Sequence, residues 1–350
     1  MIILRVLVFI TGTALIIWAI FSAVQTLVLP RNAQDKLTRL VFMSIRWIFS
    51  IRLRWLHSYA ERDRLMAFFA PVSLLSLVPT WLMLLLLGYM GLFWSLGGLT
   101  WLEAFWISGS SLLTLGFAVS KSFSSTLLAF SEAALGLMMV ALLIAYLPTM
   151  YAAFSRREVA VTLLDVRAGN PPSAMQMIAR YHRIHGLDQL KEQWQIWEAW
   201  FADIEESHTS LPALVFFRSP KPDHSWVTAA GTVLDAASLT LSAIDIPASP
   251  HAALCIRAGF LALRHIADFF NIPYSHDPHY PIQTISITRQ EFDQACDELK
   301  SQGLPIKADR DQVWQDFAGW RVNYDQVLLA LVNLTMPPAA PWSGNRPDKN

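Results

Sequence analysis

The chain has 350 residues, of which 54% are hydrophobic and only 15% are charged, and its formal net charge is zero. Soluble domains usually carry about 25% charged residues, so the composition favours a membrane protein. A balanced charge gives no reason to expect a nucleic-acid partner. The two cysteines, Cys255 and Cys296, match neither a disulfide framework nor a zinc site, and they fit a reducing cytosol.

Three long apolar runs predict three transmembrane helices. Residues 1–30 contain the first, because the uncharged stretch Val6 to Leu29 is long enough at about 1.5 Å per residue to cross a ~30 Å hydrocarbon core. A cleavable signal peptide is the alternative, but its apolar region would be only ~7–15 residues long and its basic residues would come first. The second and third helices are expected at 67–89 and 126–154.

Lysine and arginine residues predict the orientation of these spans. Residues 31–66 form a basic loop, and Arg156 and Arg157 directly follow the third span. Basic residues accumulate on the cytoplasmic side, so both regions are expected in the cytosol and the amino terminus outside. Within the loop, residues 40–56 combine arginine with Trp47 and Trp55. They could form an interfacial helix on the inner leaflet or a buried cytosolic helix, and the composition does not decide between the two.

The apolar segment from Gly97 to Ser125 is expected to leave and re-enter the membrane on one side, because a fourth crossing would break the charge pattern. Thr100 and Glu103 form a capping box, which predicts a short helix from Trp101 to about Leu113. Such a helix, about 20 Å long, reaches only the middle of the membrane. The glycine and β-formers that follow favour an extended return. Unpaired carbonyls at that depth, with the negative end of a helix dipole beside them, favour a cation.

This order of outer helix, pore helix, filter and inner helix resembles the tetrameric pore-loop potassium channels over about Ala67 to Arg157. Phe105 and Trp106 stand where that family often has paired aromatic residues that brace the filter, and residues 113–117 (Leu-Thr-Leu-Gly-Phe) look like its Thr-Val-Gly-Tyr-Gly signature. The resemblance implies a homotetramer that conducts potassium or another monovalent cation. It implies an ion pathway and a gating hinge at Gly136. The pathway residues are Thr114, Leu115, Gly116, Phe117 and Ala118.

The sequence departs from the family signature at two points. Ala118 replaces the last filter glycine, and its Cβ would resist a left-handed backbone by about 1–2 kcal/mol. The acidic residue that follows in the family has no counterpart, whereas Lys121 is expected near the outer mouth of the pore. These departures bear on potassium selectivity more than on the pore-loop architecture.

Residues 156–335 are expected to form an all-α cytosolic domain, since apolar residues recur at helical spacing between turn signals. Residues 336–350 are rich in proline and polar residues and are expected to be disordered. The apolar stretch Trp226 to Ile246 contains Asp235 and Asp245, so a buried helix is preferred to a fourth span. His182, His185 and an acidic cluster at 203–208 have the chemistry of a metal site but no recognised ligand spacing.

The sequence therefore predicts an all-α, multi-pass protein of the cell membrane that acts as a cation channel subunit in contact with lipid. No motif indicates an enzyme or a cofactor. The alternative is a membrane-anchored scaffold or interaction protein whose pore loop is degenerate and does not conduct. Fourfold assembly around Thr114 would separate the two hypotheses, because a ring of carbonyls needs symmetry and an anchor does not.

Overall fold

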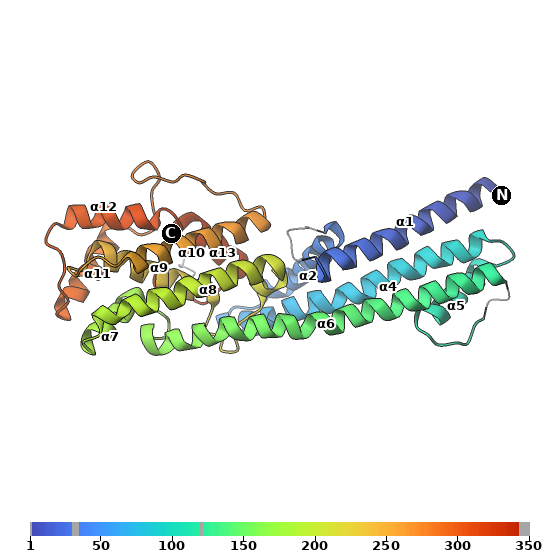
Figure 1. Cartoon of the computed structure of the whole chain (residues 1–350), viewed down its shortest axis with the longest axis horizontal. Helices are drawn as coiled ribbons and strands as arrows, with labels where there is room; N and C mark the ends of the chain where they lie inside the picture. Colours follow the sequence, from blue (N-terminus) through green and yellow to red (C-terminus); the bar gives the residue numbers. More distant parts are fainter. Residues whose placement is uncertain (1, 30–34, 120–121, 343–350) are drawn as a thin grey trace. The chain divides into compact units, whose positions relative to one another are not determined.

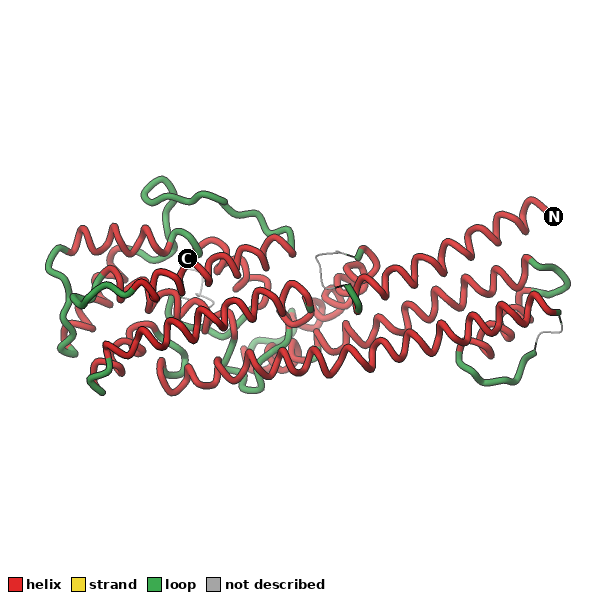
Figure 2. The backbone as a smooth tube through the Cα atoms, in the orientation of Figure 1, coloured by secondary structure: helices red, strands yellow, loops and turns green. Residues whose placement is uncertain are grey.

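The computed structural model describes residues 2–29, 35–119 and 122–342, and the regular elements among them are helices (Figures 1 and 2). This confirms the predicted all-α class. The chain divides into two compact units. Unit 1 comprises residues up to 56 together with 65–152, and unit 2 comprises residues 57–64 together with those from 153 onward.

Three helical stretches are long and apolar enough to cross a membrane, as predicted. They are α1 (Ile2–Leu27), the stretch Tyr59–Ser95, which contains α3 (Tyr59–Ala67) and α4 (Phe69–Ser95), and α6 (Phe123–Ala168). The 46 residues of α6 correspond to about 69 Å of helix, more than twice the thickness of the hydrocarbon core. The helix therefore continues well past the predicted end of the third span.

Helices α1 and α4 of unit 1 approach closely through two glycines. A Cβ built on Gly12 would lie 2.6 Å from the Gly88 carbonyl oxygen, so no larger residue fits there without a shift. A buried polar chain joins the same helices to α2 (Lys36–Leu53): Trp81 Nε1 donates to Ser22 Oγ at 2.9 Å, and Ser22 donates to Asp35 at 2.5 Å. Asp35 in turn caps α2 by accepting the Thr38 amide at 2.8 Å.

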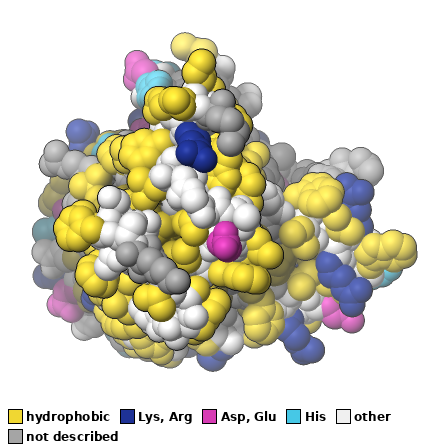
Figure 3. Space-filling model, turned by 90° about the vertical axis from the view of Figure 1, so that its right-hand side faces the viewer, with side chains coloured by type: hydrophobic (Ala, Val, Ile, Leu, Met, Phe, Trp, Pro, Cys, Tyr) yellow, Lys and Arg dark blue, Asp and Glu magenta, His cyan; other side chains and the backbone are white. Residues whose placement is uncertain are grey.

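The outer surface of unit 1 is apolar. Ile2, Ile10 and Phe21 of α1 and Leu137 and Ile144 of α6 each expose more than half of their side-chain surface. The end of the unit that carries the start of α1 and the α4–α5 turn shows mostly hydrophobic and uncharged side chains (Figure 3). A contiguous apolar surface of this kind is what contact with lipid or with other membrane helices requires.

Unit 2 is built from helices that surround a buried central helix, α9 (Trp226–Ser242). All of α9 except Leu241 is buried, which explains why a stretch apolar enough to suggest a span is instead a core helix. The other helices of this unit are α7 (Ala174–Arg183), α8 (Leu190–Ser210), α10 (Pro250–Phe269), α11 (Arg289–Ser301), α12 (Arg310–Arg321) and α13 (Asp325–Thr335), with two 3-10 helices, η1 (Leu187–Gln189) and η2 (Pro212–Phe216).

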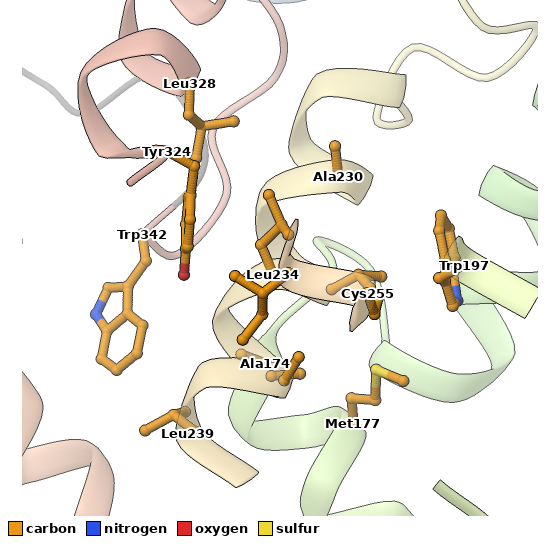
Figure 4. Close-up of a cluster of buried hydrophobic side chains, with 14 of the residues drawn as sticks. Ala174, Met177, Trp197, Ala230, Leu234, Leu239, Cys255, Tyr324, Leu328 and Trp342 are labelled. Atoms are coloured by element: carbon orange, nitrogen blue, oxygen red, sulfur yellow. The ribbon is translucent and has the colours of Figure 1, made fainter. Parts of the chain in front are cut away.

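The core of unit 2 lies around α9. Leu234 and Leu239 of α9 belong to one buried cluster with side chains of α7, α10 and α13, among them Met177, Cys255 and Leu328 (Figure 4). Cys255 and Cys296 are both free and buried. Burial raises the pKa of both thiols, that of Cys296 to about 11, so both are protonated and unreactive at neutral pH.

The described part of the predicted disordered tail, residues 336–342, packs on unit 2 instead. Trp342 is buried, its ring lies 5.6 Å from that of Phe317, and its carbonyl oxygen accepts a hydrogen bond of 2.9 Å from Arg321. Arg218 also donates to the Met336 carbonyl at 2.8 Å, so one large aromatic side chain and two charge-assisted hydrogen bonds hold a segment that proline content alone marks as disordered. The rest of the tail lies outside the described residues.

Candidate functional site

The candidate site is the connection between α4 and α6, which contains the short helix α5 (Trp101–Leu112). Helix α4 ends and α6 begins at the same end of unit 1, and α5 turns back between them (Figures 1 and 2). The predicted capping box is confirmed: the Thr100 amide donates to Glu103 Oε2 at 2.8 Å, and the Glu103 amide donates to Thr100 Oγ1 at 3.3 Å. The 12 residues of α5 make it about 18 Å long.

The carboxyl end of α5 closes in a left-handed turn rather than running on into a strand. Thr114 has φ 53°, its amide donates to the Ser111 carbonyl at 3.1 Å, and the Leu115 amide donates to the Ser110 carbonyl at 2.8 Å. This pair of bonds is a Schellman motif, which normally places glycine where Thr114 stands. A β-branched residue in this conformation costs about 1–2 kcal/mol. The predicted extended return is therefore wrong at its start, because the helix cap takes the first two residues.

Ser110 also holds the loop that follows. Its hydroxyl accepts the Ala118 amide at 3.1 Å, so the same serine binds the chain at Leu115 and at Ala118. Gly116 has φ 73°, a left-handed conformation that glycine adopts without strain, whereas Ala118 has no positive φ. The conformational conflict that the sequence suggested at Ala118 does not arise in this loop.

The expected ion-pathway residues lie together on an exposed loop. Thr114, Leu115, Gly116 and Phe117 are exposed and Ala118 is partly buried. Among the described residues, no donor bonds to the carbonyl oxygens of residues 114–118. Free carbonyls beside the negative end of α5 give this loop the chemistry of a cation ligand. Lys121, the expected outer-mouth residue, lies outside the described residues.

Gly136, the expected gating hinge, lies inside α6 where that helix meets the end of α5. A Cβ built on Gly136 would lie 2.5 Å from the Leu112 carbonyl oxygen. The structure thus gives a packing reason for this glycine: it lets the end of α5 rest directly on the α6 backbone. Its role as a hinge stays a prediction.

Sequence reasoning missed Glu132 as part of the site. This side chain of α6 is fully buried, and its Oε1 atom lies 2.5 Å from Ser108 Oγ of α5. Ser108 Oγ is also 3.1 Å from the Leu86 carbonyl oxygen of α4, so the three helices meet at one hydroxyl. The sequence did mark Glu132 as a candidate, because it is the only charged residue between Phe123 and Ser155.

The histidine and acidic cluster in unit 2 forms separate pairs rather than a site. Asp203 pairs with Arg156 at 3.1 Å and Glu205 with His265 at 2.7 Å. His208 is buried 3.3 Å from Arg157, and burial followed by that positive charge holds its pKa well below the ordinary value. Within residues 2–29, 35–119 and 122–342, no group of three or more potential ligands could hold a metal ion.

Comparisons with protein-family models, curated proteins and solved structures give no match to this chain.

Proposed function

We propose that the chain is a subunit of a homotetrameric cation channel of the pore-loop kind, with residues 114–118 as the ion pathway. The observation that carries the proposal is the arrangement of α5 between two apolar helices, with its carboxyl end leading into a loop whose carbonyl oxygens have no donor among the described residues. Irregular backbone at membrane depth is tolerated only inside protein or beside a watery path. Potassium or another monovalent cation is the ligand that a ring of carbonyl oxygens suits.

Four copies are needed because one loop cannot surround an ion. Leu115 and Phe117 expose 60% and 64% of their surface in the single chain, and Phe105 and Trp106 of α5 are about half exposed. Neighbouring subunits around a fourfold axis would cover these side chains and bring the carbonyl oxygens of four loops together. Both the pore loop and the similarity to potassium channels are part of what we propose.

The proposal includes an orientation in the cell membrane. The basic residues between the first two apolar stretches, and Arg156 and Arg157 after α6, support an orientation with unit 2 in the cytosol and the amino terminus outside. Helix α2 exposes Trp47 and Ile48, by 67% and 57%, and carries Arg46 and Arg52, a composition that suits the inner leaflet.

The alternative function, a membrane-anchored scaffold with a loop that does not conduct, draws support from Thr114. Its strained position is explained by capping α5 alone, and a helix cap needs neither symmetry nor an ion. Conduction and assembly measurements separate this alternative from the channel.

The test is single-channel recording of the purified full chain in lipid bilayers with potassium and sodium gradients. We expect cation current from the wild type and none from Gly116→Val, because valine is strained at φ 73° and residue 116, unlike Thr114, is not held by the helix cap, so the loop carbonyls would turn away. Gly98→Val is the matched control: Gly98 has φ 80°, and, as at Gly116, nothing lies within 4 Å of an added Cβ, but it precedes α5.

Conduction by Gly98→Val but not by Gly116→Val, with both variants assembled as four chains in light scattering, supports the ion pathway. Unaltered current in Gly116→Val would remove the assignment of residues 114–118. A wild type that assembles and inserts but carries no cation current would favour the scaffold.

A further inference from the structure

Glu132 is a carboxyl group that has no oppositely charged partner among the described residues. It is fully buried, and its second oxygen, Oε2, has no hydrogen-bond partner among the described residues. No described lysine, arginine or histidine forms an ion pair with it. The titratable side chain that faces it is Tyr89 of α4, which is uncharged and bonded through its hydroxyl to Ser131 Oγ at 2.9 Å. The element packed on the other side, α5, contributes the neutral Ser108.

Ser108 has too few hydrogens for its two close contacts unless the Glu132 carboxyl group is protonated. Ser108 Oγ has one hydrogen, but two oxygens lie within hydrogen-bond distance: the Leu86 carbonyl at 3.1 Å and Glu132 Oε1 at 2.5 Å. The Leu86 carbonyl can only accept, and an ionised Glu132 could also only accept, so one serine hydrogen cannot serve both. Both contacts are hydrogen bonds at once only if Glu132 carries a proton and donates it to Ser108 Oγ.

We infer that Glu132 is a proton-binding site that is occupied at neutral pH and that fastens α5 to α4 and α6. An ionised carboxylate here would have no cation among the described residues and no water-exposed edge, and it would compete with the Leu86 carbonyl for the one Ser108 hydrogen. Loss of the proton therefore costs one of the two bonds by which Ser108 joins α5 to α4 and α6. Ser110, two residues further along α5, holds the loop at Leu115 and Ala118, so the loop responds to the same event.

The first experiment is infrared difference spectroscopy of the purified full chain at neutral pH. We expect the wild-type minus Glu132→Gln spectrum to show the C=O band of a protonated carboxylic acid, which disappears as the pH is raised. Glu103→Gln is the matched control, because Glu103 is exposed and glutamine also serves in a capping box. Its difference spectrum should show ionised carboxylate bands. Carboxylate bands in the Glu132→Gln difference at neutral pH would overturn the inference.

The second experiment measures whether the proton fastens α5. Hydrogen exchange of the amides in residues 101–118, corrected for the intrinsic effect of pH, should accelerate several-fold in the wild type as the infrared band is lost. Glu132→Gln should show no such acceleration, because its amide can still donate to Ser108 without titrating. Ser108→Ala should exchange faster at every pH. Equal acceleration in the wild type and Glu132→Gln would refute the coupling.

Both measurements are independent of ion conduction, so the inference can fail while the channel proposal stands, and the reverse. The consequence that rests on the proposed function is a pH profile. Cation current should fall in alkaline solution in the wild type and stay constant in Glu132→Gln. A wild type without current leaves the infrared and exchange results to decide the proton site.

Discussion

Unit 2 contains a buried cluster of charged side chains centred on Arg321. Arg321 is fully buried, is paired with Asp235, donates to Asp325 at 2.8 Å and holds the Trp342 carbonyl. Burial lowers the pKa of Arg321, but the charges of Asp235 and Asp325 raise it more, so the guanidinium stays charged. The arginine therefore supplies a positive charge beside two carboxyl groups that could not be buried as anions alone.

Replacing this arginine should be severely destabilising. Arg321→Met leaves Asp235 and Asp325 without their cation, and breaking a buried ion pair from one side costs about 3–5 kcal/mol. The measurement is thermal unfolding of the full chain in detergent, followed by circular dichroism. Adding Asp235→Asn to Arg321→Met should restore part of the loss, since it removes one of the stranded charges.

Arg289→Met is the control for this prediction. Arg289 pairs with Asp293 and Asp311 at distances like those of Arg321, but its side chain is 36% exposed. Exposed pairs contribute about 0–1 kcal/mol, so a small effect is expected. Similar losses in Arg289→Met and Arg321→Met would show that burial of the pair is not what matters.

At the residue scale, sequence alone identified the candidate ion pathway but not its backbone conformation. The pattern Leu-Thr-Leu-Gly-Phe marked residues 113–117, yet the cap made by Thr114 and Leu115 depends on carbonyls of α5 one turn earlier. Trp342 was misjudged because its partners, Phe317 and Arg321, become neighbours only in the folded chain. Contacts of this kind leave no local signal.

At the scale of helices, prediction was better because the deciding signals are local. The capping box at Thr100 and Glu103 predicted the start of α5. The length of the uncharged stretches predicted the three apolar helices. The stretch Trp226 to Ile246 was correctly taken to be buried rather than membrane-spanning, because Asp235 would be costly in lipid, and the helix in it ends at Ser242. The end of α6 was missed, since nothing at Ser155 stops a helix that continues to Ala168.

The contact between α5 and α6 gives a prediction at this scale. Gly136→Ala would put a Cβ 2.5 Å from the Leu112 carbonyl oxygen and 3.1 Å from Leu112 Cδ1, so the two helices must separate. Overpacking of this kind costs about 1–3 kcal/mol, and we expect a lower melting temperature in detergent.

Gly109→Ala on α5 is the matched control, because the nearest atom to its added Cβ is Leu86 Cδ1 at 3.7 Å, an ordinary contact. Alanine also favours a helix over glycine by up to about 1 kcal/mol, so this variant should be as stable as the wild type or more so. If Gly136→Ala has the same melting temperature as the wild type, the close approach of α5 and α6 does not restrict residue 136 to glycine.

At the scale of the whole molecule, the proposed orientation in the membrane depends on charge rather than on packing. The basic residues cluster between the first two apolar stretches and after α6, whereas Lys121 is the only one between α4 and α6. A topology with three crossings keeps both clusters on the cytoplasmic side. It also requires the connection from α4 to α6 to begin and end outside.

Labelling of single cysteines tests this orientation, and the chain suits the method because Cys255 and Cys296 are buried with raised thiol pKa values. The native cysteines should give little background. Three exposed serines allow conservative Ser→Cys probes: Ser58 in the basic segment, Ser124 at the start of α6 and Ser301 at the end of α11.

With a membrane-impermeant maleimide on intact cells, we expect the Ser124→Cys probe to be labelled and the Ser58→Cys and Ser301→Cys probes to react only after the membrane is opened. The reason is electrostatic, since moving either basic cluster outside would oppose the charge asymmetry that sets orientation during insertion. Labelling of Ser301→Cys on intact cells would place unit 2 outside. Protection of Ser124→Cys, with full reaction after permeabilisation, would put the α4–α6 connection on the cytosolic side and reverse the direction in which α5 enters the membrane.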